Sequence, residues 1–191
     1  MRPHVWAFDL DGTLLNTWEI NYQAYATVGV KMPNHAHGLS WQEWLPEYCG
    51  GNFAVAGTLH SAKTQIYLRR LIECDLQGME LPPLEVMREL HRDNPTRVKV
   101  LTASSVISTR RLMNRLGFED IEYHAELTYA MRRRHLATWN VHANVTYVDD
   151  NIKTIHRLNE DITDPIINTV HFDGQDVATL KNQMEAPEWK R

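Results

Sequence analysis

The sequence predicts an α/β fold: a Rossmann-like parallel sheet of about five strands flanked by helices, with a small helical cap inserted after the first strand. Three observations lead to it. The apolar run Val5–Phe8 ends on Asp9, which is typical of a parallel strand buried on both faces. From residue 82 onward, strand-like and helix-like segments alternate. Residues 15–81 show helical patterns and no clear strand.

The alternating part of the chain predicts the core, element by element. Further strands are expected at residues 98–101, 121–124, 145–148 and 166–172. Helices are expected at about residues 83–92, 105–116, 131–140, 152–159 and after residue 172. Ser105 is a suitable N-cap and Gly117 a suitable C-terminal stop, and the segment 121–124 is short enough for an edge strand. Right-handed crossovers would place all strand carboxyl ends at one edge of the sheet.

The segment that breaks the alternation predicts a cap. We expect residues 15–81 to form a helical cap, and residues 1–14 and 82–191 to form the core. Its helical patterns lie near residues 18–28, 40–48 and 59–76.

Four large side chains of the cap have two possible roles each. Trp41 and Trp44 share one helical face, which favours packing inside the cap over stacking on a substrate. Lys31 and Lys63 are expected at the surface, with substrate contact as the alternative.

Length and composition limit the class of protein. A chain of 191 residues has room for one core domain and a modest insert. A formal net charge of −4 gives no general attraction to nucleic acid or anionic membranes, and no apolar run approaches membrane-spanning length. Two cysteines and a first strand that starts within five residues of the N-terminus favour a reduced, cytoplasmic protein without a signal peptide.

Two carboxylates at the end of the first strand form the strongest functional signal. Asp9 and Asp11 occupy alternate positions, so both address one side of the strand end, and Gly12 permits a sharp turn. Ligands of open α/β sheets bind at this edge. Because two close carboxylates repel each other unless a cation or proton joins them, the pair indicates a metal, an acid/base role or both. The alternative is an ordinary Asp-Gly turn at a solvated strand end.

The run Asp9–Thr13, with the pattern DxDGT, resembles motif one of the haloacid dehalogenase (HAD) superfamily. The resemblance implies that Asp9 attacks a phosphoryl group to form an aspartyl phosphate, a recognised kind of covalent catalysis. Asp11 would protonate the leaving oxygen and then activate water. The second Asp favours phosphoryl transfer over carbon–halogen cleavage, and an insert after the first strand is similar to the family's small helical C1 cap.

Two further motifs of the family have counterparts here. Thr102 follows the strand at 98–101 and corresponds to the motif-two hydroxyl, with the Ala103 amide as a second phosphate ligand. Motif three is usually Lys, but this stretch offers only Arg132, Arg133 and Arg134. Helical spacing places Arg132 on the inward face with Leu136, so Arg132 is chosen as the phosphate-binding cation, with Arg134 or a solvated charge run as alternatives.

Paired acids at the end of the strand at 145–148 predict a metal site. Asp149 and Asp150 would join Asp9 at the same sheet edge, and such hard oxygen ligands favour Mg²⁺. The resemblance implies that Mg²⁺ is held by Asp9, by the backbone carbonyl of Asp11 and by Asp149 or Asp150, one of them directly.

These observations together predict a Mg²⁺-dependent phosphatase that hydrolyses a phosphomonoester, either a small metabolite or a nucleotide. Three alternatives stay open: phosphoryl transfer to a second hydroxyl, a catalytically impaired HAD-fold binding or regulatory protein, and a nucleic-acid end-processing phosphatase. The absent motif-three Lys is the support for the second. No aromatic and basic groove supports the third, so neither nucleic acid nor a membrane is an expected partner.

Overall fold

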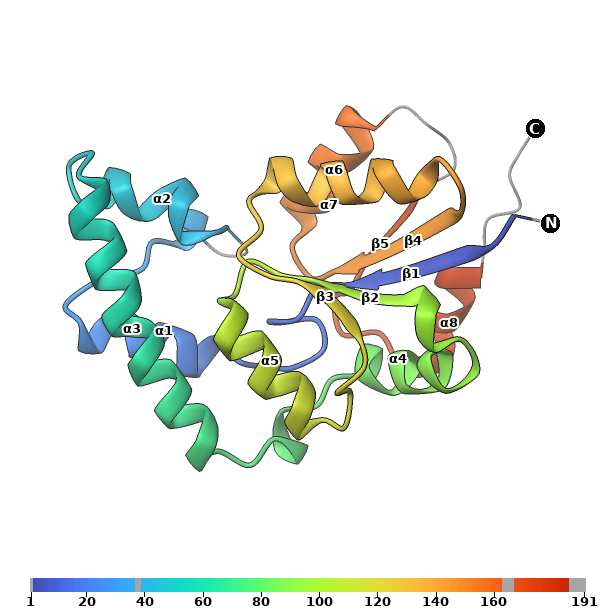
Figure 1. The fold of residues 1–191 in the computed structure, drawn as a ribbon, viewed down its shortest axis with the longest axis horizontal. Coiled ribbons are helices and arrows are strands. Elements are labelled where there is room, and N and C mark those ends of the chain that lie inside the picture. The colour runs from blue at the N-terminus through green and yellow to red at the C-terminus, as the bar shows by residue number, and fades with distance from the viewer. Residues whose placement is uncertain (1, 37–38, 163–166, 186–191) are drawn as a thin grey trace.

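The computed structural model describes residues 2–36, 39–162 and 167–185. Within these residues, five strands form one parallel sheet in the order β3-β2-β1-β4-β5 (Figure 1). They are β1 (His4–Phe8), β2 (Val98–Leu101), β3 (Glu122–His124), β4 (Asn144–Asp149) and β5 (Ile167–His171). In the register of the central strand, Phe8 pairs with Val100 of β2 and Val148 of β4. The predicted α/β class and parallel sheet are confirmed.

The strand boundaries agree closely with the sequence pattern. β2 has the expected bounds, and β3 lies at an edge of the sheet, as its shortness suggests. β4 extends through Asp149, so this carboxylate is the last residue of the strand. The expected first residue of the last strand, Ile166, lies outside the described residues.

Helices cover both faces of the sheet. One layer holds α6 (Tyr129–Asn140) and α7 (Ile152–Asp161), and the other holds α4 (Pro82–Asp93), α5 (Val106–Arg115) and α8 (Val177–Glu185) (Figure 1). Ala7 packs in one apolar cluster with Leu136 of α6, whereas Phe8 packs in another with Leu112 of α5. Because successive side chains of a strand point to opposite faces, a continuous apolar run is what this two-sided burial requires.

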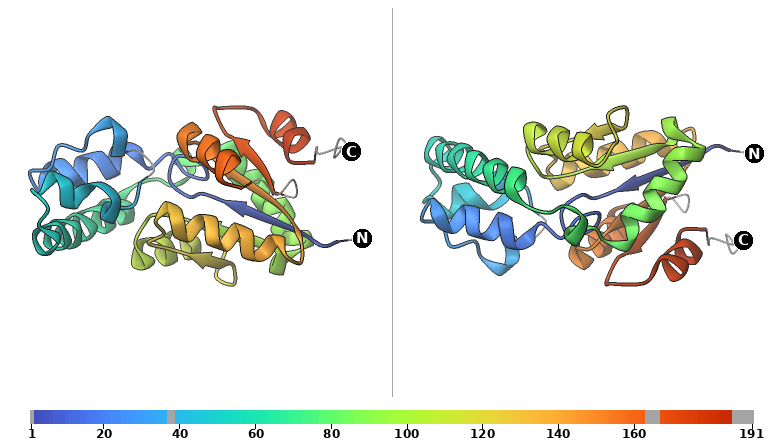
Figure 2. Two further views of the ribbon diagram at one scale, coloured as in Figure 1. Left: turned by 90° about the horizontal axis from the view of Figure 1, so that it is seen from above. Right: turned by 90° about the horizontal axis from the view of Figure 1, so that it is seen from below.

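The insert after β1 is helical, as expected. It contains α1 (Trp18–Thr27), α2 (Trp41–Tyr48) and α3 (Phe53–Glu73), and Figure 2 shows it as a lobe beyond the carboxyl ends of the strands. α3 begins six residues before the predicted position near residue 59. The cause is Asn52, whose side chain accepts hydrogen bonds from the amides of Ala54 and Val55, both at 3.1 Å.

The insert has a small core of its own, and hydrogen bonds on two sides also join its helices to helices of the core. Trp44 and Leu45 are buried inside it. On one side, Arg115 of α5 donates hydrogen bonds to the carbonyl oxygens of Leu71 and Cys74 at the end of α3. On the other side, Glu43 of α2 accepts one from the Tyr129 amide at the start of α6, at 3.1 Å. The insert is thereby held over the strand ends.

In the described ranges, no helix combines the length and the apolar character needed to cross a membrane.

Candidate active site

The loop after β1 turns at Gly12 and is packed too closely for any other residue. Gly12 has a φ of +89°, and a Cβ there would lie 2.3 Å from both Asp150 Oδ2 and Trp18 Nε1. The Asp9 amide bonds to the Val148 carbonyl oxygen at 2.9 Å, which extends the β1–β4 ladder to the first acidic residue. The DxDGT segment therefore places its carboxylates against the end of β4.

Asp9 is buried and paired with one cation. The residue is only 6% exposed, and it lines the pocket. The Arg132 guanidinium donates to Asp9 Oδ1 at 3.3 Å and to Asp149 Oδ2 at 2.7 Å, so one planar fork joins two carboxylates. Arg134, the alternative, is exposed at the surface of α6.

The two acids after β4 have different surroundings. Asp149 is fully buried, and both of its oxygens have donors: the Asn151 amide at 2.7 Å on Oδ1, and the Tyr147 hydroxyl at 2.6 Å beside Arg132 on Oδ2. Asp150 is half-buried, and Thr13 donates its hydroxyl to Asp150 Oδ1 at 3.0 Å. Asp150 is the more exposed of the two, so a further ligand reaches it more easily.

Asp9, Asp149 and Asp150 converge as a metal-binding group would. One carboxylate oxygen from each lies within 4.8 Å of the others. Burial, followed by repulsion from Asp149, raises the pKa of Asp9 well above its usual range, although Arg132 opposes this. Burial and then Asp149 also raise the pKa of Asp150 to about 7. The site gathers more negative charge than its single arginine balances.

Asp11 is oriented by three hydroxyl groups. Thr17 and Tyr67 donate to Oδ1, the latter at 2.9 Å, and Ser104 donates to Oδ2. These partners come from the start of α1, from α3 and from the loop after β2. The carboxyl group of Asp11 thus lies where the insert and the core meet.

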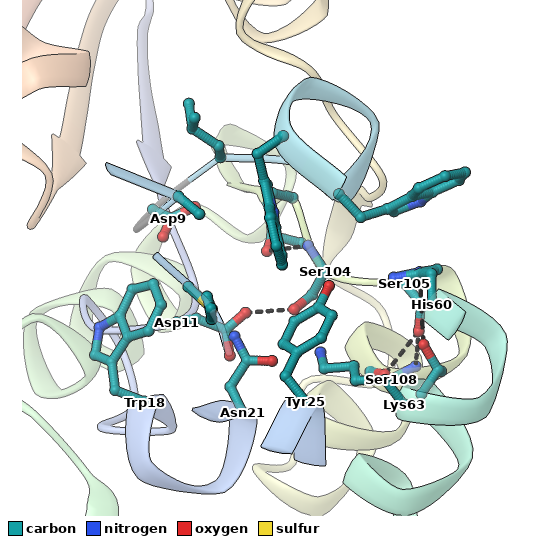
Figure 3. Close-up of a pocket in the computed structure, with 18 of the residues that line it drawn as sticks. Asp9, Asp11, Trp18, Asn21, Tyr25, His60, Lys63, Ser104, Ser105 and Ser108 are labelled. Carbon is teal, nitrogen blue, oxygen red and sulfur yellow. Dashed lines mark hydrogen bonds between the residues drawn. The ribbon is translucent and has the colours of Figure 1, made fainter. Parts of the chain in front are cut away.

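A single pocket unites most of the predicted residues. Asp9 and Asp11 line it (Figure 3), and so do Thr102, Ala103 and Arg132. Thr102 is buried, and its hydroxyl accepts a hydrogen bond from the Ser104 amide at 3.0 Å.

The insert supplies the opposite wall of this pocket. Its contributions are mostly polar or aromatic side chains: Trp18, Asn21, Tyr25, Trp41, His60 and Lys63. Trp44 is buried in the insert, as expected, whereas Trp41 stacks on the His60 ring with centroids 4.9 Å apart. The expectation of a surface position for Lys63 is wrong, because this residue is 8% exposed.

Three residues that organise the site lie outside the motifs: Tyr147 supports Asp149, and Tyr67 and Ser104 orient Asp11. Thr13, the last residue of the DxDGT motif, supports Asp150. A usable signal exists for Tyr147, since it stands two positions before Asp149 and therefore on the same side of the strand. Tyr67 carries no comparable signal, because its partner lies 56 positions away.

Comparisons with known proteins bear on the fold. No protein-family model matches the sequence, and no curated protein matches it. A HAD hydrolase of family IA, variant 3, from Entamoeba histolytica is 12% identical, with a TM-score of 0.65 over 97% of this chain and 91% of its own.

Two other solved structures match over similar lengths. CbbY from Rhodobacter sphaeroides, in complex with phosphate, is 15% identical, with a TM-score of 0.68 over 100% of this chain and 91% of its own. A β-phosphoglucomutase from Clostridium difficile is 18% identical, with a TM-score of 0.63 over 94% and 87%. This chain has the fold of the HAD-superfamily hydrolases, a parallel sheet with a helical insert after β1.

Proposed function

We propose that this protein is a Mg²⁺-dependent phosphatase that hydrolyses a phosphomonoester through an aspartyl phosphate on Asp9. The observation that carries the proposal is the placement of Asp9: a buried carboxylate, held by Arg132, in one pocket with Asp11 and Thr102. The HAD-hydrolase fold and the phosphate in the solved CbbY structure support it.

In the first step, an Asp9 carboxylate oxygen attacks phosphorus while the bond from phosphorus to the ester oxygen breaks. Asp11 gives a proton to that leaving oxygen, which departs as an alcohol. Arg132, Thr102 and the Ala103 amide hold the phosphoryl oxygens during the transfer. Because Arg132 bonds to both Asp9 and Asp149, it also fixes the direction from which the nucleophile approaches.

In the second step, water attacks the same phosphorus atom and the bond between phosphorus and the Asp9 oxygen breaks. Asp11 now takes the proton from the water, so it returns to the state in which the cycle began. The three hydroxyls around Asp11 keep its carboxyl group in place for both transfers.

The donor set fits Mg²⁺, a hard cation that prefers carboxylate and carbonyl oxygens. Asp9, Asp150 and the Asp11 backbone carbonyl would hold the ion, with Asp149 assisting through Arg132 and through water, because its own oxygens already have donors. When bound, the ion would offset the repulsion between the carboxylates and an anionic phosphoryl group.

The insert serves as the lid in this proposal, with residues 15–81 as cap and residues 1–14 and 82–191 as catalytic core. It lines one side of the pocket and brings Tyr67 to Asp11. A lid of this kind excludes water and selects the substrate, which we take to be a phosphorylated small molecule, nucleotides included.

Release of inorganic phosphate from a panel of sugar phosphates, organic-acid phosphates and nucleoside monophosphates tests the proposal. We expect release with Mg²⁺, none with EDTA, and recovery when Mg²⁺ is restored. Analysis of the products with an added alcohol separates hydrolysis from transfer to a second hydroxyl. A folded protein that releases phosphate from none of them, or equally well in EDTA, would favour a binding or regulatory role.

A further inference from the structure

Lys63 is a buried cation that forms no ion pair with any of the described residues. It is more than nine-tenths buried, and in the described part of the chain its ammonium group forms neither a hydrogen bond nor an ion pair. It lies instead over two aromatic rings, 4.5 Å from the centroid of Tyr67 and 4.8 Å from that of Tyr25. A charge that is largely removed from water and has no ion-pair partner is costly, so its presence here calls for a reason.

The position of Lys63 on α3 explains both its burial and its direction. It belongs to the inward stripe of this helix with Ala56, Tyr67 and Leu71, which are otherwise packed. At Lys63 the stripe meets the pocket that contains Asp9 instead of apolar core (Figure 3). Burial lowers the pKa of Lys63 to about 8, with Asp11 acting in the opposite direction, so the group is still largely charged at neutral pH.

The neighbours of Lys63 in the pocket also suit an anion. His60, one turn earlier on α3, has a buried Nδ1 that is unpaired within the described residues. Burial and then Lys63 lower the pKa of His60 to about 4, so it is a neutral ring that can donate one hydrogen bond. Ser105 and Ser108, at the start of α5, line the core side of the same pocket, where a helix N-terminus favours negative charge.

We propose that the phosphomonoester substrate carries a second anionic group, a carboxylate or another phosphate. Lys63, whose ammonium group lies over the rings of Tyr25 and Tyr67, binds this group with help from His60. This inference rests on the proposed phosphatase activity and deepens it by naming the substrate class. The pocket then has two parts. Asp9, Arg132 and Thr102 hold the phosphoryl group that is transferred, and the insert binds the anionic group at the other end of the substrate.

Three probes of similar length test the proposal: glycerol 3-phosphate, 3-phosphoglycerate and propane-1,3-diol bisphosphate. They end in a neutral alcohol, a carboxylate and a second phosphate, so the last two distinguish the kinds of anion. We expect the wild type to prefer at least one of the charged probes by about tenfold or more in kcat/KM. In Lys63→Met this preference should be lost, mainly through KM, whereas Lys63→Arg should retain part of it.

Arg69→Met is the matched control, because Arg69 is an exposed cation on the same helix, and its preference should equal that of the wild type. The inference is overturned if the wild type does not discriminate between the three probes. It is also overturned if Lys63→Met lowers kcat/KM for all three by the same factor, since that pattern means that Lys63 only positions Asp11 through Tyr67.

Failure of the proposed function gives a different result: no phosphate is released from any of the three probes or from p-nitrophenyl phosphate. Calorimetric titration of 3-phosphoglycerate into the wild type and Lys63→Met then decides the inference without turnover. Binding that is about tenfold weaker in Lys63→Met supports it. Equal binding by the two proteins, or no binding to the wild type, contradicts it.

Discussion

The two walls of the pocket satisfy their charges in different ways. On the core wall, Arg132 is paired with Asp9 and Asp149, and Asp11 has three hydroxyl donors. On the wall supplied by the insert, Lys63 lies over two aromatic rings and forms no ion pair within the described residues. The ion pairs of Arg132 and the hydrogen bonds of Asp11 are already formed before substrate binds. Such preorganisation suits catalysis, because the phosphoryl-transfer step is the same for every substrate. A cation that has no ion-pair partner among the described residues suits substrate recognition, because an anionic group of the substrate can supply the missing counter-charge.

Asp9→Asn removes the nucleophile from the core wall, and we expect the largest effect from it. Turnover should fall by about 10⁴-fold or more, because an amide does not form the covalent intermediate. Stability should not decrease, since the change removes one of three crowded carboxylates and leaves an acceptor for Arg132. Phosphate release and thermal melting measure the two quantities. The exposed Asp120→Asn is the control, and near-normal Mg²⁺-dependent activity in Asp9→Asn would contradict the mechanism.

Arg132→Met breaks the paired network of the same wall. It leaves Asp9 and Asp149 buried without their cation, so we expect a loss of about 3–5 kcal/mol in the free energy of unfolding. Turnover should fall by about 10²-fold or more. Arg132→Lys keeps the positive charge but loses the planar guanidinium that bonds to two carboxylates at once. Its free energy of unfolding and its turnover should lie between those of Arg132→Met and the wild type.

Arg134→Met is the control for this pair, because Arg134 is an exposed cation two residues away. Its free energy of unfolding, measured by urea denaturation, should stay within about 0.5 kcal/mol of the wild type. A larger loss of turnover in Arg134→Met than in Arg132→Met would mean that Arg134, and not Arg132, binds the phosphoryl group.

The sequence predicts the core wall much better than the wall of the insert. Asp9, Asp149 and Asp150 follow apolar strands, and parallel topology alone requires such strand ends to meet at one edge. Arg132 can be chosen by its helical phase relative to Leu136, and both are buried on α6. For these residues, local pattern determines position.

The position of Lys63 depends on tertiary packing instead. Taken singly, a lysine on an amphipathic helix is expected at the surface, yet α3 turns this residue inward with Tyr67 and Leu71. Its phase on the helix is a usable signal, but the direction of that face depends on how the insert sits over the strands.

The early start of α3 has a simpler, local cause, because it follows from the N-cap at Asn52 and not from the apolar periodicity that begins near residue 59.

Gly12→Ala tests how closely the core wall is packed. The substitution adds a Cβ at a φ of +89°, 2.3 Å from Asp150 Oδ2. Gly29→Ala is a matched control, because Gly29 has a φ of +77° but a Cβ added there would meet no atom within 4 Å, so it isolates the backbone strain. We expect Gly12→Ala to cost about 2 kcal/mol more than Gly29→Ala in urea denaturation. Equal losses would mean that the loop gives way and the packing is not tight.

Lys63→Met should stabilise the free protein, in contrast to Arg132→Met. The folded-state pKa of Lys63 is lowered from 10.5 to about 8 by burial, so folding carries a penalty wherever this group must be charged. Below pH 8 the penalty is complete, and it fades as the pH rises from 8 to 10.5, where the folded state loses its proton before the unfolded state does.

The expected gain in Lys63→Met is of the order of 1–3 kcal/mol near pH 7 and smaller near pH 10. Denaturation of Lys63→Met and of the surface variant Arg69→Met across this pH range measures it. A loss of stability in Lys63→Met that does not change with pH would show that the lysine is an ordinary packing element and would remove the contrast between the two walls.

Borohydride trapping tests whether Asp9 becomes phosphorylated during turnover. A reaction quenched in acid and then reduced converts an aspartyl phosphate to homoserine, which peptide mass spectrometry can locate. We expect homoserine at residue 9, dependent on substrate and Mg²⁺ and absent from Asp9→Asn. Homoserine at residue 11, 149 or 150 in its place would contradict the assignment of Asp9 as the nucleophile.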